Sequence, residues 1–322
     1  MKATFSSYGQ PEEVIELSAL ELSPLPDHQV KVKILAAPIN PADINYVQGS
    51  YGIKPELPSS AGLEGCGVVT ESKSKDFTSG DKVIFTGRVG TWAKEVITHS
   101  ENLLKIPEQT PTEQASMLKV NPLTAWCILT QLRTLPNGSW IIQNAANSGV
   151  GYCVIQIAKL IGLKTINLVR RAELLPELEA IGGDINLLDN AEYINTLPEQ
   201  KPLLAINAVG GDSALRMMEA LAPKGLHITY GAMSMRSLKV PNKFLIFKGI
   251  QIQGFWITEW IKEQDPEFVK CSYLMLAQLM IDQSLAQPID SSFPLSEIHS
   301  ALSRAKTSKR NGKVLLEINN SN

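Results

Sequence analysis

One short turn between an apolar strand and an amphipathic helix constrains this chain more than any other feature. The turn spans residues 143–151, QNAANSGVG, and the helix pattern after it repeats apolar residues at three- and four-residue spacing. Glycines let a backbone approach a bound group closely, and a helix N-terminus offers free N–H donors and a positive dipole end. This combination suits a pyrophosphate. The first hypothesis is therefore a dinucleotide cofactor, and the second is hydride transfer.

The remaining patterns divide the chain into two regions. Strand and helix patterns alternate from residue 139 to residue 255, which predicts βαβ units and a doubly wound parallel sheet. Residues 1–118 instead read as short strands between clusters of Pro, Gly, Asp and Ser, which predicts a barrel-like β domain. A long amphipathic helix is expected over 266–283, and a final strand over 312–318 is expected to return to the β domain.

A chain of 322 residues is long for a single core, so two domains are the natural expectation. The fold class is α/β. We predict a catalytic β domain made of residues 1–118 and 259–322, and a dinucleotide-binding domain over residues 119–258.

Composition excludes several classes of partner. The formal net charge is −2, which argues against binding to nucleic acid or to an anionic membrane surface. No apolar run reaches the ~18–20 residues that would span a bilayer. The first residues resemble neither a signal peptide nor a transit segment, so we expect a cytoplasmic location.

Metal ligation is not expected. The four cysteines are scattered without a C-x-x-C pair, which fits buried thiols rather than a disulfide frame or zinc knuckle. The four histidines also lie far apart in the sequence, and each is expected at the surface or at an edge.

The strand predicted at 165–169 ends at Arg170 and Arg171. NAD-binding proteins usually carry an acidic residue near this strand end for the ribose 2′-hydroxyl, whereas an arginine accommodates a 2′-phosphate. With no acid before Glu173, the sequence favours NADPH. The alternative is that one or both arginines are solvated residues at a helix start.

Two short motifs carry a resemblance to a known family. Zinc-containing medium-chain dehydrogenase/reductases have a Cys before x-x-Asp and a Gly-His-Glu, whereas this chain reads NPAD at 40–43 and GLE at 62–64. Both metal-ligand positions are therefore substituted. The chain resembles the zinc-independent branch of this superfamily, which includes quinone reductases and enoyl-thioester reductases.

Within that branch, the chain is similar over nearly its full length to mitochondrial-type trans-2-enoyl-CoA or acyl-carrier-protein reductases. The stretches that carry this similarity are 40–52, which resembles the family's active-site loop, the NSGVG turn at 147–151, TYGAM at 229–233, and LIFK through GFW at 245–256. Ala232 replaces a family glycine. The resemblance implies a GroES-like barrel-type domain, a Rossmann domain and NADPH-dependent reduction of enoyl thioesters in fatty acid metabolism.

The resemblance also implies a set of site residues. Tyr51 occupies the family's catalytic tyrosine position, where its phenol would stabilise an enolate, orient the thioester or supply the proton for C2. The alternative is a loop tyrosine that packs on its own turn. The expected cofactor-binding residues are Asn121, Asn147, Ser148, Gly149, Val150, Arg170, Arg171, Tyr230, Gly231, Ala232, Met233, Phe255, Trp256, Ile257 and Lys313. For Phe255 and Trp256 the alternative is ordinary core packing.

The expected partner is an acyl thioester of coenzyme A or of acyl carrier protein, and a basic run at Lys306, Lys309 and Arg310 is a candidate contact. Two other functions stay open, an NADPH:quinone reductase and a catalytically idle NADPH-binding protein. A homodimer is expected, in which the edge strand at 250–255 pairs with its twin.

Overall fold

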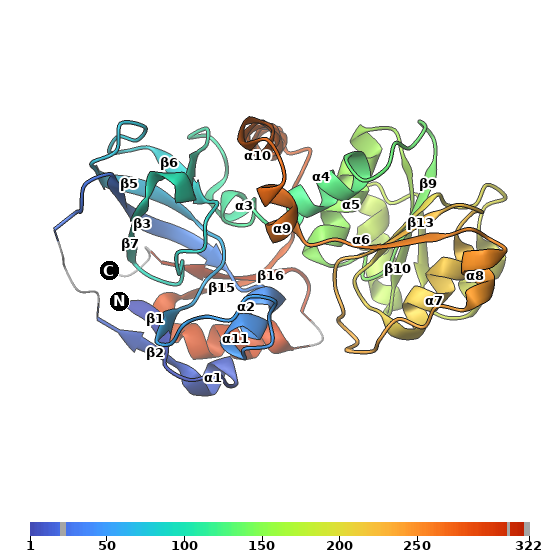
Figure 1. The fold of residues 1–322 in the computed structure, drawn as a ribbon, viewed down its shortest axis with the longest axis horizontal. Coiled ribbons are helices and arrows are strands. Elements are labelled where there is room, and N and C mark those ends of the chain that lie inside the picture. Colours follow the sequence, from blue (N-terminus) through green and yellow to red (C-terminus); the bar gives the residue numbers. More distant parts are fainter. Residues whose placement is uncertain (20–23, 308–309, 319–322) are drawn as a thin grey trace. The chain divides into compact units, whose positions relative to one another are not determined.

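The computed structural model describes residues 1–19, 24–307 and 310–318. The chain divides into two compact units (Figure 1), which are described separately below. The first unit comprises Met1–Val120 and Lys270–Asn322, and the second comprises Asn121–Val269. The domain boundaries predicted from the sequence, after residues 118 and 258, remain predictions.

The first unit contains two β-sheets. The smaller sheet has the order β2-β1-β4 and is antiparallel. The larger sheet has the order β15-β16-β3-β5-β6-β8, and β7 also pairs with β3. The strands are β1 (Lys2–Phe5), β2 (Ile15–Ser18), β3 (Gln29–Pro38), β4 (Ser59–Ser60), β5 (Cys66–Ser72), β6 (Lys82–Phe85), β7 (Glu95–His99), β8 (Leu103–Lys105), β15 (Ile289–Pro294) and β16 (Lys313–Glu317).

Strand β3 organises the larger sheet because its alternating sequence places one face in the core. Val30, Val32 and Ile34 have no exposed surface, whereas the lysines between them are not buried. β16 pairs antiparallel with β3, which confirms that the C-terminal strand returns to the β-rich unit.

Short helices accompany these sheets. They are α1 (Pro11–Val14), α2 (Pro41–Val47), α3 (Thr112–Ser116) and α11 (Ile298–Lys306), and α10 (Pro266–Ile281) contains the boundary between the units. Helix α11 was not predicted. It buries Ile298, Ala301, Leu302 and Ala305 in the core of the first unit, at the three- and four-residue spacing of a helix face.

The second unit has a six-stranded parallel sheet of order β11-β10-β9-β12-β13-β14. In chain order this is 3-2-1-4-5-6, the doubly wound arrangement that the alternating patterns predicted. The strands are β9 (Trp140–Gln143), β10 (Lys164–Val169), β11 (Ile185–Leu188), β12 (Leu204–Asn207), β13 (Leu226–Thr229) and β14 (Gln251–Gly254). The helices are α4 (Asn121–Thr130), α5 (Gly149–Leu160), α6 (Leu175–Ala180), α7 (Gly211–Ala220), α8 (Asn242–Ile246) and α9 (Ile257–Lys262).

Helices cover both faces of this sheet (Figure 1). Leu168 of β10 packs in a cluster with Met217 of α7, whereas the next residue, Val169, packs in a cluster with Ile155 of α5 and Leu178 of α6. Neighbouring residues of one strand therefore face opposite cores, as the two-residue period of a strand requires.

Two sequence-based expectations were wrong, and one strand was missed. β11 was not predicted, because the strand is only four residues long and lacks alternation. Cys271 is exposed, although the other three cysteines are buried as expected. His227 is fully buried in β13 and is therefore not a surface histidine. Burial lowers the pKa of its imidazole to about 4, so the ring is neutral near pH 7.

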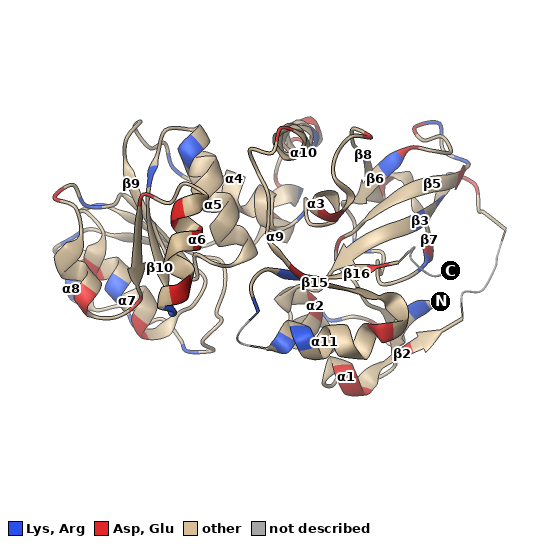
Figure 2. Cartoon of the chain, turned by 180° about the vertical axis from the view of Figure 1, so that it is seen from behind, with Lys and Arg blue, Asp and Glu red and all other residues tan. Residues whose placement is uncertain are grey.

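Charged residues of both signs are interspersed along both units (Figure 2), in keeping with the small net charge. Among the described residues, no helix combines the length and the apolar character that crossing a membrane would take.

Candidate functional site

The turn after β9 is the best-formed part of the predicted cofactor site. Ser148 is the N-cap of α5, and its hydroxyl accepts a hydrogen bond from the backbone N–H of Gly151 at 3.1 Å. A Cβ on Gly151 would lie only 2.4 Å from the carbonyl oxygen of Ala146, so the helix can start this close to the turn only with glycine. Asn147 directly precedes this N-cap residue, and Gly149 and Val150 begin the helix. The remaining N–H groups of this 12-residue helix can bind an anion.

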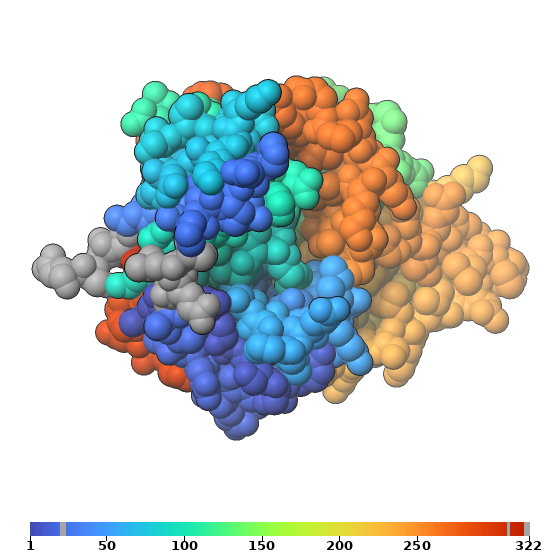
Figure 3. Space-filling view, turned by 60° about the vertical axis from the view of Figure 1, so that its left-hand side comes forward, coloured from blue at the N-terminus to red at the C-terminus, as the bar shows by residue number. Residues whose placement is uncertain are grey.

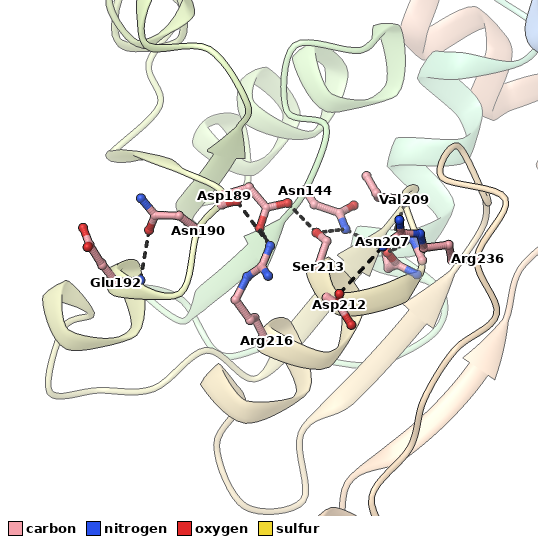
Figure 4. Close-up of polar contacts among 11 residues, drawn as sticks. Asn144, Asp189, Asn190, Glu192, Asn207, Val209, Asp212, Ser213, Arg216 and Arg236 are labelled. Carbon is pink, nitrogen blue, oxygen red and sulfur yellow. Dashed lines mark hydrogen bonds and ion pairs between the residues drawn. The ribbon is translucent and has the colours of Figure 1, made fainter.

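Buried amides hold the strand ends beneath this turn. The side chain of Asn144 donates to Asn207 Oδ1 and to Ser213 Oγ, both at 2.8 Å, and accepts from the backbone of Ala208 at 2.7 Å. Figure 4 shows these side chains converging from β9, β12 and α7. The bonds fix the carboxyl ends of the two central strands, where open α/β sheets bind ligands. Neither Asn144 nor Asn207 was among the predicted site residues, although each stands at the end of a strand.

The same cluster continues to the edge of the sheet. Ser213 donates to Asp189 Oδ2 at 2.5 Å, and Arg216 donates to Asp189 Oδ1 at 2.5 Å (Figure 4). Asp189 directly follows β11, so the network ties the edge strand to α7. Its charges are matched internally.

The two arginines after β10 differ in their surroundings. Arg171 forms an ion pair with Glu173 at 3.4 Å. Arg170 is exposed, and its side chain has no hydrogen bond or ion pair with any described residue. Arg170 is therefore the arginine with donors available for a 2′-phosphate.

The loop after β13 carries the next four predicted residues. Tyr230 N donates to Asn207 O at 3.0 Å, and Met233 N donates to Ala208 O at 2.9 Å, so the loop is bound to the end of β12. A Cβ on Gly231 would lie 3.0 Å from Ala208 O, which explains a small residue there. Ala232 and Met233 are exposed.

The predicted nicotinamide-side residues follow β14. Phe255 is buried and packs against Trp260 with ring centroids 6.2 Å apart. Trp256 is the N-cap residue of α9, and Ile257 begins that helix. Phe255 therefore packs within the second unit, and its contact with the nicotinamide stays a prediction. Asn121, buried, begins α4 in the same unit.

Tyr51 lies in the first unit, shortly after α2. The resemblance indicated a loop over 40–52, but residues 41–47 form a helix with Asn40 and Asp43 as a capping box. The backbone of Tyr51 donates to Asn45 O at 3.1 Å, and its half-buried ring packs against the core of the unit. Figure 3 shows the segment around residue 50, in light blue, at the surface.

A buried polar network includes Asn40, which stands at one of the two substituted metal-ligand positions. Asn40 Nδ2 donates to Glu64 Oε1 at 2.8 Å, and Lys313 Nζ donates to Asn40 Oδ1 at 2.5 Å. Glu64 also accepts from Val120 N at 3.0 Å. Burial raises the pKa of Glu64, and the Lys313 ammonium opposes that rise.

These contacts place Lys313 in the first unit with its ammonium group bound to Asn40. The described residues contain no cluster of three or more His, Cys, Asp or Glu side chains that could hold a metal ion. The buried polar network of this unit therefore combines the Asn40 amide, the Glu64 carboxylate and the Lys313 ammonium group.

Of the predicted basic run, Lys306 is bound to other residues of the first unit. Lys306 binds Glu12 at 2.5 Å and Gln10 at 2.8 Å. Lys309 lies outside the described residues. Arg310 is half-buried, and burial lowers the pKa of its guanidinium.

Two family models match the chain. "Alcohol dehydrogenase GroES-like domain" matches residues 26–108, and "Zinc-binding dehydrogenase" matches residues 149–271. Together with the three sheets, they confirm the predicted GroES-like domain and the Rossmann-type parallel sheet.

Relatives match over most of their length. The mitochondrial enoyl-acyl-carrier-protein reductase of Rattus norvegicus is 39% identical over 314 residues, which cover 92% of this chain and 83% of that protein. The enzyme of the same name from Xenopus tropicalis is 38% identical and covers 97% of this chain and 93% of its own length.

Solved structures also match this chain over nearly its full length. Etr1p in complex with NADP and crotonyl-CoA has a TM-score of 0.89 at 27% identity, with 98% of each chain covered. The Candida tropicalis Etr1p/Etr2p heterodimer, a mitochondrial 2-enoyl thioester reductase, gives the same values. A quinone oxidoreductase of Pseudomonas syringae has a TM-score of 0.84 at 26% identity, covering 98% of this chain and 99% of that one. This chain therefore belongs to the family of mitochondrial enoyl-acyl-carrier-protein reductases, within the medium-chain dehydrogenase/reductase superfamily.

Proposed function

We propose that this chain reduces the double bond of trans-2-enoyl thioesters with NADPH, as an enzyme of fatty acid metabolism. The observation that carries the proposal is the 39% identity, over 92% of the chain, to an enoyl-acyl-carrier-protein reductase. The thioester carrier is coenzyme A or acyl carrier protein, because a relative of this fold has been solved with crotonyl-CoA and others are named for the carrier protein.

NADPH, when bound, supplies a hydride for C3 of the substrate. The residues of the chain must then stabilise the negative charge that develops on the thioester oxygen and provide a proton for C2. We assign the first task to the Tyr51 hydroxyl, which lies on a half-buried ring held against the core. The same hydroxyl is an acid that can give its proton to C2, directly or through water.

The second unit has the groups that the cofactor needs. The N–H donors at Asn147, Gly149 and Val150 suit the pyrophosphate. Ser148, whose own N–H donates to Ala145 O at 2.8 Å, is assigned to the same group through its side chain. Arg170 suits the 2′-phosphate, because its side chain has no other partner among the described residues. We assign the adenosine or ribose side to the loop over 230–233, and the nicotinamide side to Phe255, Trp256 and Ile257. Arg171, Asn121 and Lys313 remain predicted contacts.

Two alternatives make different predictions for Tyr51. A quinone reductase delivers hydride to a flat ring and does not need the tyrosine, whereas an idle NADPH-binding protein reduces no acceptor. The test measures NADPH oxidation with crotonyl-CoA and with a simple quinone, for the wild type and for Tyr51→Phe. We expect turnover of crotonyl-CoA and a loss of about 100-fold or more in kcat for the variant. Quinone reduction alone, unaffected by the substitution, would refute the proposal.

We infer a homodimer built on β14. Within the part of the chain that the structure describes, this strand pairs only with β13, so its outer edge offers unpaired backbone groups. Close by in the sequence, Ile246 and Phe247 are 70% and 86% exposed. Pairing of two β14 strands about a two-fold axis would satisfy the edge and cover apolar surface. A sedimentation velocity run at micromolar concentration tests this, and a monomer would contradict it.

The cytoplasmic location stays a prediction, since the relatives carry "mitochondrial" in their names. Fractionation of the source cells, with immunodetection of the chain, tests it.

A further inference from the structure

Arg88, in the loop after β6, shares its surroundings with Tyr51. Its guanidinium carbon lies 4.1 Å from the ring centroid of Tyr46 and 5.3 Å from that of Tyr51. Tyr46 is a rigid support, because its buried ring packs edge-on against Phe5 at 5.9 Å and its hydroxyl lies 3.3 Å from Ser59 Oγ. The cation is thus held against the proposed catalytic tyrosine.

The donors of this guanidinium have no acceptor within the described residues. Arg88 forms no hydrogen bond or ion pair there, and its Nη2 atom is buried without a partner. Burying an unpaired donor is costly, so such groups usually have an acceptor. Two other arginines of the chain have such an acceptor. Arg304 donates two hydrogen bonds to Asp290, of 2.7 and 2.6 Å, and Arg216 donates one to Asp189 at 2.5 Å.

Asp43 is the acidic residue whose ionisation Arg88 influences. The positive charge of Arg88 lowers the pKa of Asp43, against the larger effect of burial, which raises it. No hydrogen bond or ion pair joins the two side chains, because Asp43 Oδ2 accepts from the backbone of Asn40 at 2.9 Å and its Oδ1 has no partner. The chain itself therefore leaves the donors of Arg88 available to a ligand.

We propose that Arg88 is a second catalytic residue, whose guanidinium binds the thioester oxygen of the substrate beside the Tyr51 hydroxyl. This inference rests on the proposed function. As the C3–H bond forms, the electrons of the double bond move toward the carbonyl, and its oxygen becomes negative. Arginine keeps its proton in proteins, so Arg88 stabilises this oxygen without transferring a proton. The proton that forms the C2–H bond comes from Tyr51 or water.

The test compares Arg88→Met with Arg88→Lys in NADPH-dependent reduction of crotonyl-CoA. The methionine removes charge and donors, and the lysine retains the charge without the planar fork. We expect kcat to fall about 100-fold for Arg88→Met, the range seen when one oxyanion donor is removed. We expect the kcat of Arg88→Lys to be about 10-fold higher than that of Arg88→Met, because a charged donor remains. Lys94→Met, which removes an exposed charge from the same unit, is the control and should retain wild-type kinetics.

Melting temperatures separate catalysis from folding. Arg88→Met loses no hydrogen bond within the described residues, so its Tm should stay within about 4 °C of the wild type. If the wild type reduces crotonyl-CoA and the kcat of Arg88→Met is within threefold of the wild-type value, this inference is overturned and the proposed function stands. A matching loss of activity and Tm in both Arg88 variants would also overturn it, in favour of a folding role. A wild type inactive on crotonyl-CoA would overturn the proposed function and this inference with it.

Discussion

Replacing Asp43 by Asn should change how the stability of the first unit depends on pH. The carboxyl group is 1% exposed, and burial raises its pKa from 3.8 to about 6. One pKa unit corresponds to about 1.4 kcal/mol, so the ionised form is disfavoured in the folded protein by about 3 kcal/mol. The asparagine carries no charge and still offers an oxygen to the N–H of Asn40, which the carboxylate binds at 2.9 Å.

The direction in which stability changes with pH follows from how tightly the folded and unfolded states bind the Asp43 proton. Between about pH 4 and pH 6 the folded protein holds the Asp43 proton more tightly than the unfolded chain, so stability falls as the pH rises through this window. Below pH 4 the carboxyl is neutral in both states. Above pH 6 it is ionised in both states, and the folded protein carries the full cost of burying the charge. The free energy of unfolding of Asp43→Asn, relative to wild type, should therefore rise by about 3 kcal/mol between pH 4 and pH 7.

Urea unfolding followed by circular dichroism at pH 4, 5, 6 and 7 measures this difference. Buried Glu64 titrates in both proteins, so its contribution cancels. Asp27→Asn, with a side chain that is 85% exposed, is the matched control and should shift stability by less than about 0.5 kcal/mol. A constant difference between Asp43→Asn and wild type from pH 4 to 7 would show that the carboxyl is compensated in the folded state.

Two substitutions in the second unit test the cofactor site. Arg170→Ala should raise the KM for NADPH by about 10- to 100-fold, because the 2′-phosphate loses a charged donor. The KM for NADH should stay unchanged, since NADH has no 2′-phosphate. Equal changes in the two KM values would refute the role of Arg170 in binding the 2′-phosphate. Gly151→Ala should destabilise the unit by about 1–3 kcal/mol in urea unfolding and weaken NADPH binding, because its Cβ would lie 2.4 Å from Ala146 O. Gly254→Ala is the control, since its Cβ would meet no atom within 4 Å, and a similar loss in both variants would contradict this argument.

Periodicity and turn chemistry were enough to predict the doubly wound sheet. The apolar runs of β9, β10 and β12 are buried on both faces, and glycines and polar residues separate them from helices of clear three- and four-residue spacing. Each signal is local, so it can be read without knowing the fold. The NSGVG turn likewise specifies its own geometry, since Ser148 caps α5 and Gly151 permits close packing.

Local signals were overlooked or too weak in other places. The capping pair Asn40 and Asp43, with Pro41 at the first helical position, marks the start of α2 and was available in the sequence. Strand β11 is short and lies at the edge of its sheet, so it carries no pattern of two buried faces. Its existence depends on pairing with β10.

The sequence by itself determined the fold class and the kind of cofactor turn, because both follow from residues adjacent in the chain. Only the tertiary structure decided which charged side chains are free. Arg171 is paired and Arg170 is not. Lys313 reaches Asn40 across 273 positions, and the guanidinium of Arg88 lies over the ring of Tyr51. The physical reason is that hydrogen bonds and burial depend on distance in space, which no local pattern records.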